Sequence, residues 1–350
     1  MDLLKKYDNL IFSAVIITLV LVLFNTFQKF DTDQSTEKDK HFVLLFNSGF
    51  EPESRIHHRG DPFTDDDKII GQDLSVDPPN DWVTDIDSSH NLGYFALQYQ
   101  GADTTKRIAR IVPEPGNPSN HVLKFQINEP WVNHRGSRLA RIQANIYYED
   151  PDHDVESIRE LYQRVRIFLH EDMEIVKEYP DRIHWLTIFE VWNNKTWGPE
   201  LDPYPFRITV GMGKQSAEDR ELYFMADAQD YAHRTDTSRG GYTTIWSDME
   251  TDVPIPVETW MTLEYYVKEG DDQTGRFYMS MTPDGVNKKA LFDINNFTHN
   301  TSDPDPDGIS LWNPMKLYTS TELTNFVKDN GKSLRVYWDD FEVWKNRRPK

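Results

Sequence analysis

Four side chains that can hydrogen-bond to sugars recur at every second position of RLARIQANIYY, residues 138–148. They are Arg141, Gln143, Asn145 and Tyr147, which carry a guanidinium, two amides and a phenol. In a β-strand, alternate side chains point to opposite faces, so these four would share one face and apolar residues the other. Guanidinium and amide groups bind carboxylates and hydroxyls. The spacing predicts either the floor of a carbohydrate-binding groove or an ordinary solvated face.

Two later segments repeat this alternation. In TIFEVWN, residues 187–193, and in MKLYTS, residues 315–320, apolar residues occupy one face and sugar-compatible groups the other. The residues on the polar faces are Glu190, Trp192, Lys316 and Tyr318. An exposed Trp without a ligand is uncommon, and aromatic side chains line many ligand sites. If the three segments share one sheet, we expect their polar faces to form a continuous groove.

The elements that must position these residues are short strands. From residue 41 onward, β-type runs alternate with clusters of Gly, Pro, Asn and Asp, a pattern typical of an all-β sandwich or barrel. Helical patterns are confined to two short segments, residues 154–162 and 320–329. We therefore predict an all-β fold in a single domain, residues 41–346, preceded by a polar linker at residues 29–40.

The composition narrows the class of protein. The chain has 350 residues and a formal net charge of −20, and so acidic a chain is not expected to bind nucleic acid. It contains no cysteine, which excludes disulfides and thiolate catalysis. Its stability must therefore come from the core, with or without help from a metal ion.

The N-terminal segment, residues 1–28, is expected to lie outside the folded domain. The uncharged stretch at residues 9–28 follows Lys5 and Lys6 and is long enough, at about 20 residues, to span a bilayer. It ends without the small residues of a cleavage site, which favours a membrane anchor over a cleaved signal peptide. Both alternatives place the domain outside the cytoplasm, in the periplasm or at the cell surface, anchored or secreted.

The polar strands resemble those of the jelly-roll polysaccharide lyases, the group that includes alginate, glucuronan and heparin lyases. One strand of that group carries Arg-x-Glu-x-Arg, and this chain has Arg141-x-Gln143-x-Asn145. A second strand carries Gln-x-His, and this chain has Glu190-x-Trp192. The family His is therefore replaced by a Trp in this chain.

A third strand of these lyases carries a catalytic Tyr after a Lys, in the order Lys-x-Gly-x-Tyr. Here NPMKLYTS supplies Lys316 and Tyr318 at a shorter spacing. The resemblance spans most of residues 42–345 and implies a concanavalin-like β-jelly-roll sandwich. It also implies β-elimination on an extended, uronic-acid-containing polysaccharide, in which a cation or amide neutralises the uronate and a Tyr or His transfers the proton.

The resemblance implies a role for each matching residue. Tyr318 would transfer the proton, with Arg141 and Lys316 as cations that lower its pKa. His184 could replace the missing His, and His170 and His134 are the alternatives. The residues expected to bind substrate are Gln143, Asn145, Tyr147, Glu190 and Trp192.

Two other functions fit the same strands. A non-catalytic, lectin-like module needs aromatic rings that stack on sugars and polar side chains that hydrogen-bond to them. It tolerates the loss of the family His. A glycoside hydrolase needs two carboxylates, roughly 5 to 10 Å apart. For that alternative Glu190 could pair with Glu264, since the usual Glu-x-Asp-x-x-Glu signature of sandwich hydrolases is absent.

A structural calcium ion is the cofactor that the sequence suggests, and we expect no organic cofactor. NSGFE near the start of the domain and YWDDFE near its end resemble paired segments of carbohydrate-binding jelly rolls, in which the chain ends meet around calcium. Glu51, Asp339 and Asp340 would supply the hard oxygen ligands that calcium prefers. The alternative is that these acids simply lie at strand ends.

Overall fold

The computed structural model describes residues 42–349 apart from short gaps, and Val43–Lys350 forms one compact unit. The gaps are residue 52, 59–66, 78, 87–91, 101–102, 133–137, 148–157, 194–202 and 233–240. The predicted anchor and linker lie outside the described residues. Within the described part, no helix combines the length and the apolar character needed to cross a membrane. The membrane anchor therefore stays a prediction.

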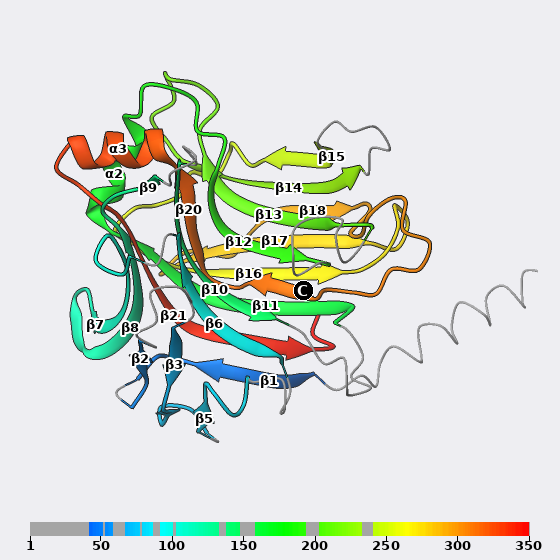
Figure 1. Cartoon of the computed structure of the whole chain (residues 1–350), viewed down its shortest axis with the longest axis horizontal. Helices are drawn as coiled ribbons and strands as arrows, with labels where there is room; N and C mark the ends of the chain where they lie inside the picture. The colour runs from blue at the N-terminus through cyan, green and yellow to red at the C-terminus, as the bar shows by residue number, and fades with distance from the viewer. Residues whose placement is uncertain are drawn as a thin grey trace, which may run out of the picture. The chain divides into compact units, whose positions relative to one another are not determined.

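One layer of the fold is an eight-stranded antiparallel sheet (Figure 1). Its strands, in spatial order, are β18 (Lys289–Asn295), β17 (Arg276–Pro283), β16 (Trp260–Lys268), β11 (Glu160–Leu169), β21 (Leu334–Lys345), β8 (Asn117–Ile127) and β7 (Arg107–Glu114), with β1 (Val43–Ser48) paired to β21. The first and last strands of the domain are thus neighbours, as expected when the two chain ends meet.

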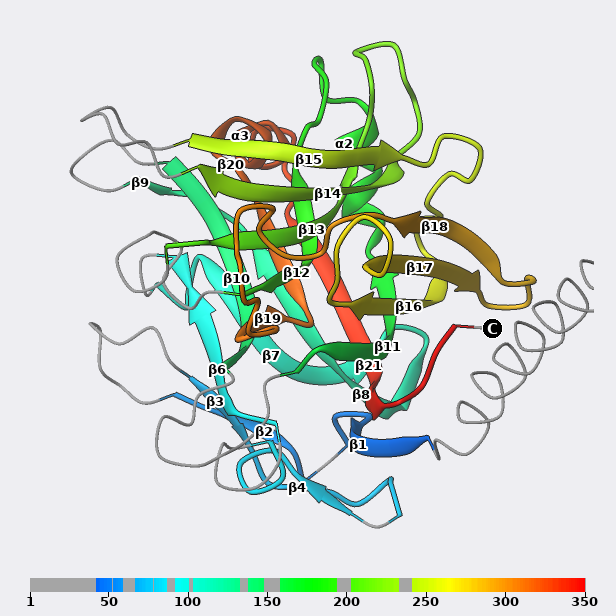
Figure 2. The same ribbon diagram turned by 90° about the vertical axis from the view of Figure 1, so that its right-hand side faces the viewer.

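The second layer is a nine-stranded sheet, seen from two sides in Figures 1 and 2. Its order is β15 (Gly241–Met249), β14 (Tyr223–Ala232), β13 (Phe206–Gly213), β12 (Leu186–Trp192), β19 (Leu311–Asn313), β10 (Arg138–Tyr147) and β20 (Lys316–Ser320), with β6 (Tyr94–Tyr99) and β9 (Trp131–Val132) also paired to β10. Strand β20 additionally pairs with β12, so β10, β12 and β20 are in one sheet as the groove hypothesis requires.

The remaining described elements are small. They are the hairpins β2 (Arg55–His57) with β3 (Lys68–Ile70) and β4 (Gln72–Asp73) with β5 (Asn80–Asp81), and the helices η2 (Glu171–Met173), α2 (Glu174–Lys177) and α3 (Thr321–Asp329). The predicted helix at residues 320–329 is confirmed as α3, whose N-cap Ser320 accepts a hydrogen bond from the Leu323 amide. The predicted helix at residues 154–162 is wrong where the chain is described, because β11 begins at Glu160.

The core lies between the two sheets, so the prediction of an all-β sandwich is confirmed. Phe189 of β12 stacks on Tyr265 of β16, with ring centroids 4.2 Å apart and planes inclined by 5°. On β10, Ile142, Ala144 and Ile146 are fully buried. Because side chains alternate along a strand, the polar residues of β10 face away from this core.

Candidate functional site

Strand pairing brings the polar residues of β10, β12 and β20 together on the outer face of the nine-stranded sheet. Arg141 lies opposite Tyr318, and Gln143 lies opposite Lys316. Glu190 lies opposite Asn313 of β19. The outer face around these residues is called the polar face below. The structure thus assembles residues that are up to 177 positions apart in the sequence, from Arg141 to Tyr318.

The centre of the polar face is a buried ion pair between Lys316 and Glu190, each 1% exposed. Lys316 Nζ also donates to Asn313 Oδ1 at 3.1 Å, and Arg207 Nη1 lies 3.4 Å from Glu190 Oε1. Burial acts to raise the pKa of Glu190, but Lys316 and Arg207 outweigh it and hold that pKa below its usual value. Burial lowers the pKa of Lys316 to about 8. Both groups are therefore charged at neutral pH.

Amide groups continue this cluster along β10. Asn145 Oδ1 accepts hydrogen bonds from Gln143 Nε2 and Asn313 Nδ2, both at 2.6 Å. Among the described residues, Gln143 Oε1, Asn145 Nδ2 and Arg141 Nε have no hydrogen-bond partner. Buried polar atoms without partners are uncommon, so these three are candidates for contacts with a ligand.

The predicted groove is more enclosed than its sequence pattern indicates. Gln143, Asn145, Glu190 and Lys316 are at most 5% exposed, because they bond to one another in a closed cluster rather than to water. The partly exposed side chains around them are Arg141, Trp192, Arg207 and Tyr318. A ligand can reach the polar face through these rim residues. Tyr147 belongs to β10, but its side chain lies outside the described part.

Tyr318 is surrounded by cations and one aromatic ring. The guanidinium carbon of Arg141 lies 5.7 Å from the centre of its ring, and Lys316 Nζ lies 5.2 Å from it. The Trp185 ring packs beside it at 4.8 Å. The expectation of a lowered pKa is wrong, because burial raises the pKa of Tyr318 and outweighs the opposing effect of Arg141. Tyr318 is therefore a neutral phenol at neutral pH.

The sequence reasoning missed several residues of the polar face. They are Gln98, Trp185, Arg207, Thr209, Asn313 and Asp227. The segment FRITVGM carries the same alternation as β12, which could have placed Arg207 and Thr209 on one face. Asp227 lies inside β14, where it alternates with Phe224 and Ala226 of the buried face, so the same rule could have placed it on the polar face. Nothing in the local sequence distinguishes Asn313 from other amides near turns.

Two of the predicted histidines do not join the polar face, and the third is not described. His184 is exposed and precedes β12, and it makes no hydrogen bond or ion pair within the described part. His170 follows β11, a strand of the other sheet. His134 lies outside the described residues. The prediction of a hydrolase pair of Glu190 with Glu264 is also wrong, because Glu264 is on β16 of the other sheet.

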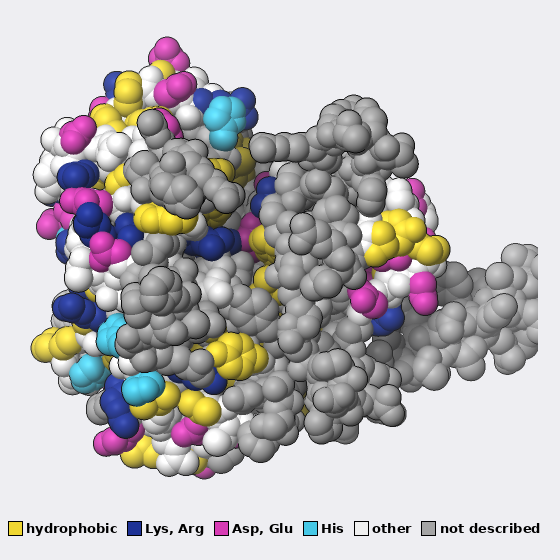
Figure 3. Space-filling view, viewed as in Figure 1, with side chains coloured by type: hydrophobic (Ala, Val, Ile, Leu, Met, Phe, Trp, Pro, Cys, Tyr) yellow, Lys and Arg dark blue, Asp and Glu magenta, His cyan; other side chains and the backbone are white. Residues whose placement is uncertain are grey.

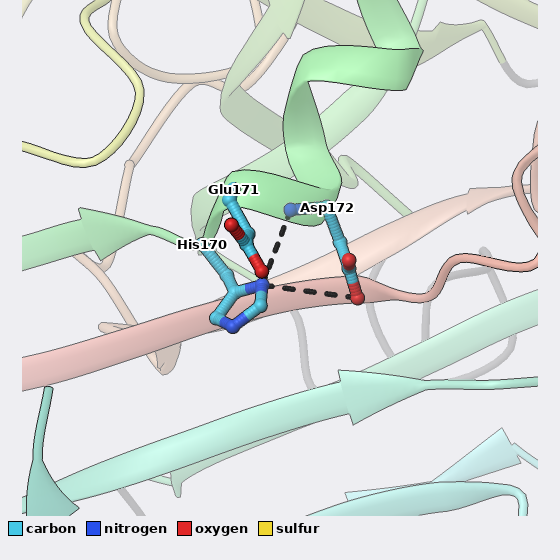
Figure 4. Close-up of side chains that lie close together, drawn as sticks. All are labelled: His170, Glu171 and Asp172. Carbon is cyan, nitrogen blue, oxygen red and sulfur yellow. Dashed lines mark hydrogen bonds and ion pairs between the residues drawn. The ribbon is translucent and has the colours of Figure 1, made fainter.

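His170, Glu171 and Asp172 form a cluster that resembles a metal site (Figure 4). Their ligand atoms lie within 4.8 Å of one another. However, Arg335 lies 2.9 Å from His170 Nε2 and 3.3 Å from Asp172, and Asp172 is also 3.2 Å from Lys332. His170 Nδ1 accepts a hydrogen bond from the Asp172 amide as the N-cap of η2. Basic groups already neutralise the charge of Asp172, and His170 caps the helix η2. We therefore interpret the cluster as a helix cap and not as a metal site.

The residues predicted to bind calcium line a cavity of about 260 Å³ beside β1 and β21. Asp339 Oδ1 and Asp340 Oδ1 both approach Gly49, and an added Cβ there would lie 3.6 and 3.9 Å from them. Burial, and then the charge of Asp340, raise the pKa of Asp339 to about 7. Glu51 is on the cavity wall but faces His121 Nδ1 at 3.7 Å. Arg166 Nη1 lies 3.9 Å from Asp339 Oδ2 and 3.7 Å from Asp340 Oδ2, so one cation faces the two carboxylates. Two neighbouring carboxylates with a single cation beside them keep hard oxygen ligands of the kind that a divalent cation prefers.

The comparisons with known proteins report similarity of fold. No known family profile and no curated protein matches the sequence. A solved alginate lyase in complex with an alginate tetrasaccharide is similar, with 14% identity, 71% of this chain and 86% of that chain covered, and a TM-score of 0.40. A fungal endo-β-1,4-glucuronan lyase from Trichoderma reesei has 15% identity, 68% and 87% coverage, and a TM-score of 0.40.

A third similar structure is a non-specific endo-β-1,3(4)-glucanase, with 13% identity, 88% and 92% coverage, and a TM-score of 0.36. The resemblance to jelly-roll polysaccharide lyases thus recurs among solved structures, beside glucanases. At these values the likeness concerns the fold, and no function follows from it.

Proposed function

We propose that the protein cleaves an anionic, uronic-acid-containing polysaccharide by β-elimination at the polar face. The observation that carries this proposal is the pairing of Arg141 with Tyr318 on adjacent strands, with the guanidinium 5.7 Å from the ring. An arginine that can hold a carboxylate thus lies beside a group that can transfer a proton, as β-elimination next to a uronate requires.

The charges of the polar face favour an anionic ligand. Lys316 and Arg207 both contact the carboxylate of Glu190, and Arg141 lies beside Tyr318, so three cations face one carboxylate at the centre of the polar face. This contrasts with the net charge of −20 of the whole chain. On the face shown in Figure 3, basic and acidic side chains of the described residues are interspersed. The local excess of cations would attract a polyuronate that the rest of the acidic surface repels.

One tyrosine can carry out both proton transfers of β-elimination. In β-elimination the C5 proton of the uronate is lost, a C4–C5 double bond forms, and the C4–oxygen bond breaks. Arg141 would stabilise the negative charge that develops on the carboxylate as C5 loses its proton. Because Tyr318 is a neutral phenol, the two proton transfers must be concerted: its oxygen takes the C5 proton as its own proton passes to the departing oxygen, and the tyrosine is neutral before and after the step.

The test is incubation of the full chain with a panel of uronic-acid polysaccharides. A rise in ultraviolet absorbance from unsaturated chain ends supports the proposal. New reducing ends without that absorbance would identify a hydrolase, and binding without either product would identify a lectin-like module. Either of these two results would overturn the assignment of β-elimination.

Trp192 provides a test that separates binding from chemistry. It is partly exposed at the end of β12 and lies opposite Arg207. Trp192→Ala is expected to weaken polysaccharide binding by about 1–3 kcal/mol, by analogy with the stacking of bases on aromatic side chains. Calorimetric titration checks this, and an unchanged affinity would remove Trp192 from the binding surface. The control is Trp344→Ala on the outer face of the other sheet.

We further propose that a calcium ion binds Asp339 and Asp340 in the cavity beside Gly49 and Glu51. The carboxylates would supply its charge-bearing ligands and join the first and last strands of the domain. At a calcium concentration of 100 times the dissociation constant, the expected stabilisation is about 2.7 kcal/mol.

Thermal unfolding in calcium and in chelator measures this effect. The variant Asp339→Asn/Asp340→Asn is expected to lose the calcium-dependent rise in melting temperature, and the surface variant Asp252→Asn is expected to keep it. Equal melting temperatures of the unaltered protein in calcium and in chelator would contradict the proposal.

A further inference from the structure

A carboxyl group with an unsatisfied oxygen lies on the polar face, two strands away from Glu190. Glu190 on β12 lies opposite Thr209 on β13, and Thr209 lies opposite Asp227 on β14. Thr209 Oγ1 donates a hydrogen bond to Asp227 Oδ1 at 2.6 Å. Asp227 Oδ2 is shielded from solvent and has no hydrogen-bond partner among the described residues. A buried polar atom of this kind needs an explanation.

The neighbours of Asp227 determine its charge. Burial raises the pKa of Asp227 and Glu190 raises it further, while Thr209 and Arg207 act in the opposite direction. Arg207 bonds to Gln229 at 3.0 Å and lies 3.4 Å from Glu190. On β15 the facing residue is the uncharged Ser247. Asp227 therefore keeps its proton to a higher pH than an ordinary aspartic acid.

A protonated carboxyl changes what this part of the face can bind. Since Thr209 donates to Oδ1, the proton of a protonated Asp227 would reside on Oδ2, which would then be an O–H donor without an acceptor among the described residues. A hydrogen bond from a neutral acid to an anionic oxygen is charge-assisted and stronger than one to a hydroxyl. An ionised aspartate at the same place would instead repel an anion.

We propose that Asp227 donates a hydrogen bond to a carboxylate of the polysaccharide at a second uronate subsite, next to Arg207. This inference rests on the proposed function and deepens it by naming the ligand. Asp227 is three strands away from Tyr318, about 14 Å at the usual spacing between strands. One sugar ring cannot contact both residues, so the substrate is a chain in which uronates recur.

Binding of chains of increasing length tests the subsite. The probes are alginate and polyglucuronate oligosaccharides, with cello-oligosaccharides as neutral controls, titrated into full-length protein carrying Tyr318→Phe to prevent turnover. Asp227→Ala is expected to weaken binding of long polyuronates at least tenfold and to leave the shortest oligosaccharides and the neutral chains within about twofold.

The pH dependence gives an independent readout. With Asp227 present, affinity for long polyuronates should fall as pH rises and the carboxyl loses its proton. Asp227→Asn keeps a donor that cannot ionise, so its affinity should stay near the low-pH value, within about threefold. Asp248→Asn, on the adjacent strand β15, removes an exposed acid and should retain the unaltered pH profile.

The outcomes separate this inference from the proposed function. Unsaturated products with no effect of Asp227→Ala on any chain would overturn the subsite and leave β-elimination intact. Binding of long polyuronates that depends on Asp227, without unsaturated products, would support the subsite and overturn the lyase. An equal loss of affinity for neutral and anionic chains would also overturn the subsite, because it would show a general structural effect.

Discussion

Replacing Tyr318 with Phe is expected to abolish cleavage while leaving polysaccharide affinity within a few-fold. The substitution keeps the ring, its contact with Trp185 at 4.8 Å and its position beside Arg141, but removes the hydroxyl that transfers the proton. General acid–base catalysis typically contributes 10²–10⁴-fold in rate, so turnover should fall by at least about 100-fold. The measurement is the initial rate of unsaturated product formation, together with calorimetric affinity.

The same substitution at Tyr337 provides the control. Tyr337 is largely buried on β21, in the other sheet, and packs against Phe168 and His170. Tyr337→Phe should therefore leave turnover unchanged. A Tyr318→Phe protein that cleaves at the normal rate would show that another group transfers the proton, and a lectin-like module would show no turnover in any variant.

The face of the sheet to which each side chain points could be predicted from the sequence, because it depends only on alternation along the strand. In β10, the period of two separates Ile142 from Gln143 whatever the strand pairs with. The same rule indicates that Glu264 points away from Leu263 and Tyr265, but it does not say to which sheet their strand belongs. The sheet to which a strand belongs depends on its pairing with distant strands. Glu264 is consequently in the eight-stranded sheet, whereas its predicted partner Glu190 is in the nine-stranded sheet.

The ion pair at the centre of the site could not be predicted for a related reason. Lys316 and Glu190 are 126 residues apart, and they meet because β19 and β20 both pair with β12. In the sequence, each residue alone is indistinguishable from an ordinary charged side chain on a solvated face. Their burial, and with it the enclosed character of the site, follows from the long-range register rather than from the residue types.

The largest expected effect on stability comes from breaking this ion pair. Lys316→Met keeps the length of the side chain but leaves Glu190 buried, with Arg207 at 3.4 Å as its remaining cation. Removing one member of a buried ion pair typically costs about 3–5 kcal/mol, because the other charge stays uncompensated. We therefore expect a loss of this size in the free energy of unfolding, measured by chemical denaturation.

The double variant Lys316→Met/Glu190→Gln tests the cause of that loss, because neutralising Glu190 removes the uncompensated charge. It should recover more than half of the stability lost by Lys316→Met alone. Lys288→Met supplies the matched control, since Lys288 pairs with Glu264 at 2.5 Å but is 36% exposed, and such pairs contribute about 0–1 kcal/mol. Equal losses in Lys316→Met and Lys288→Met would contradict a closed, desolvated pair. They would mean that solvent reaches Glu190, and that the polar face is as open as the sequence pattern first indicated.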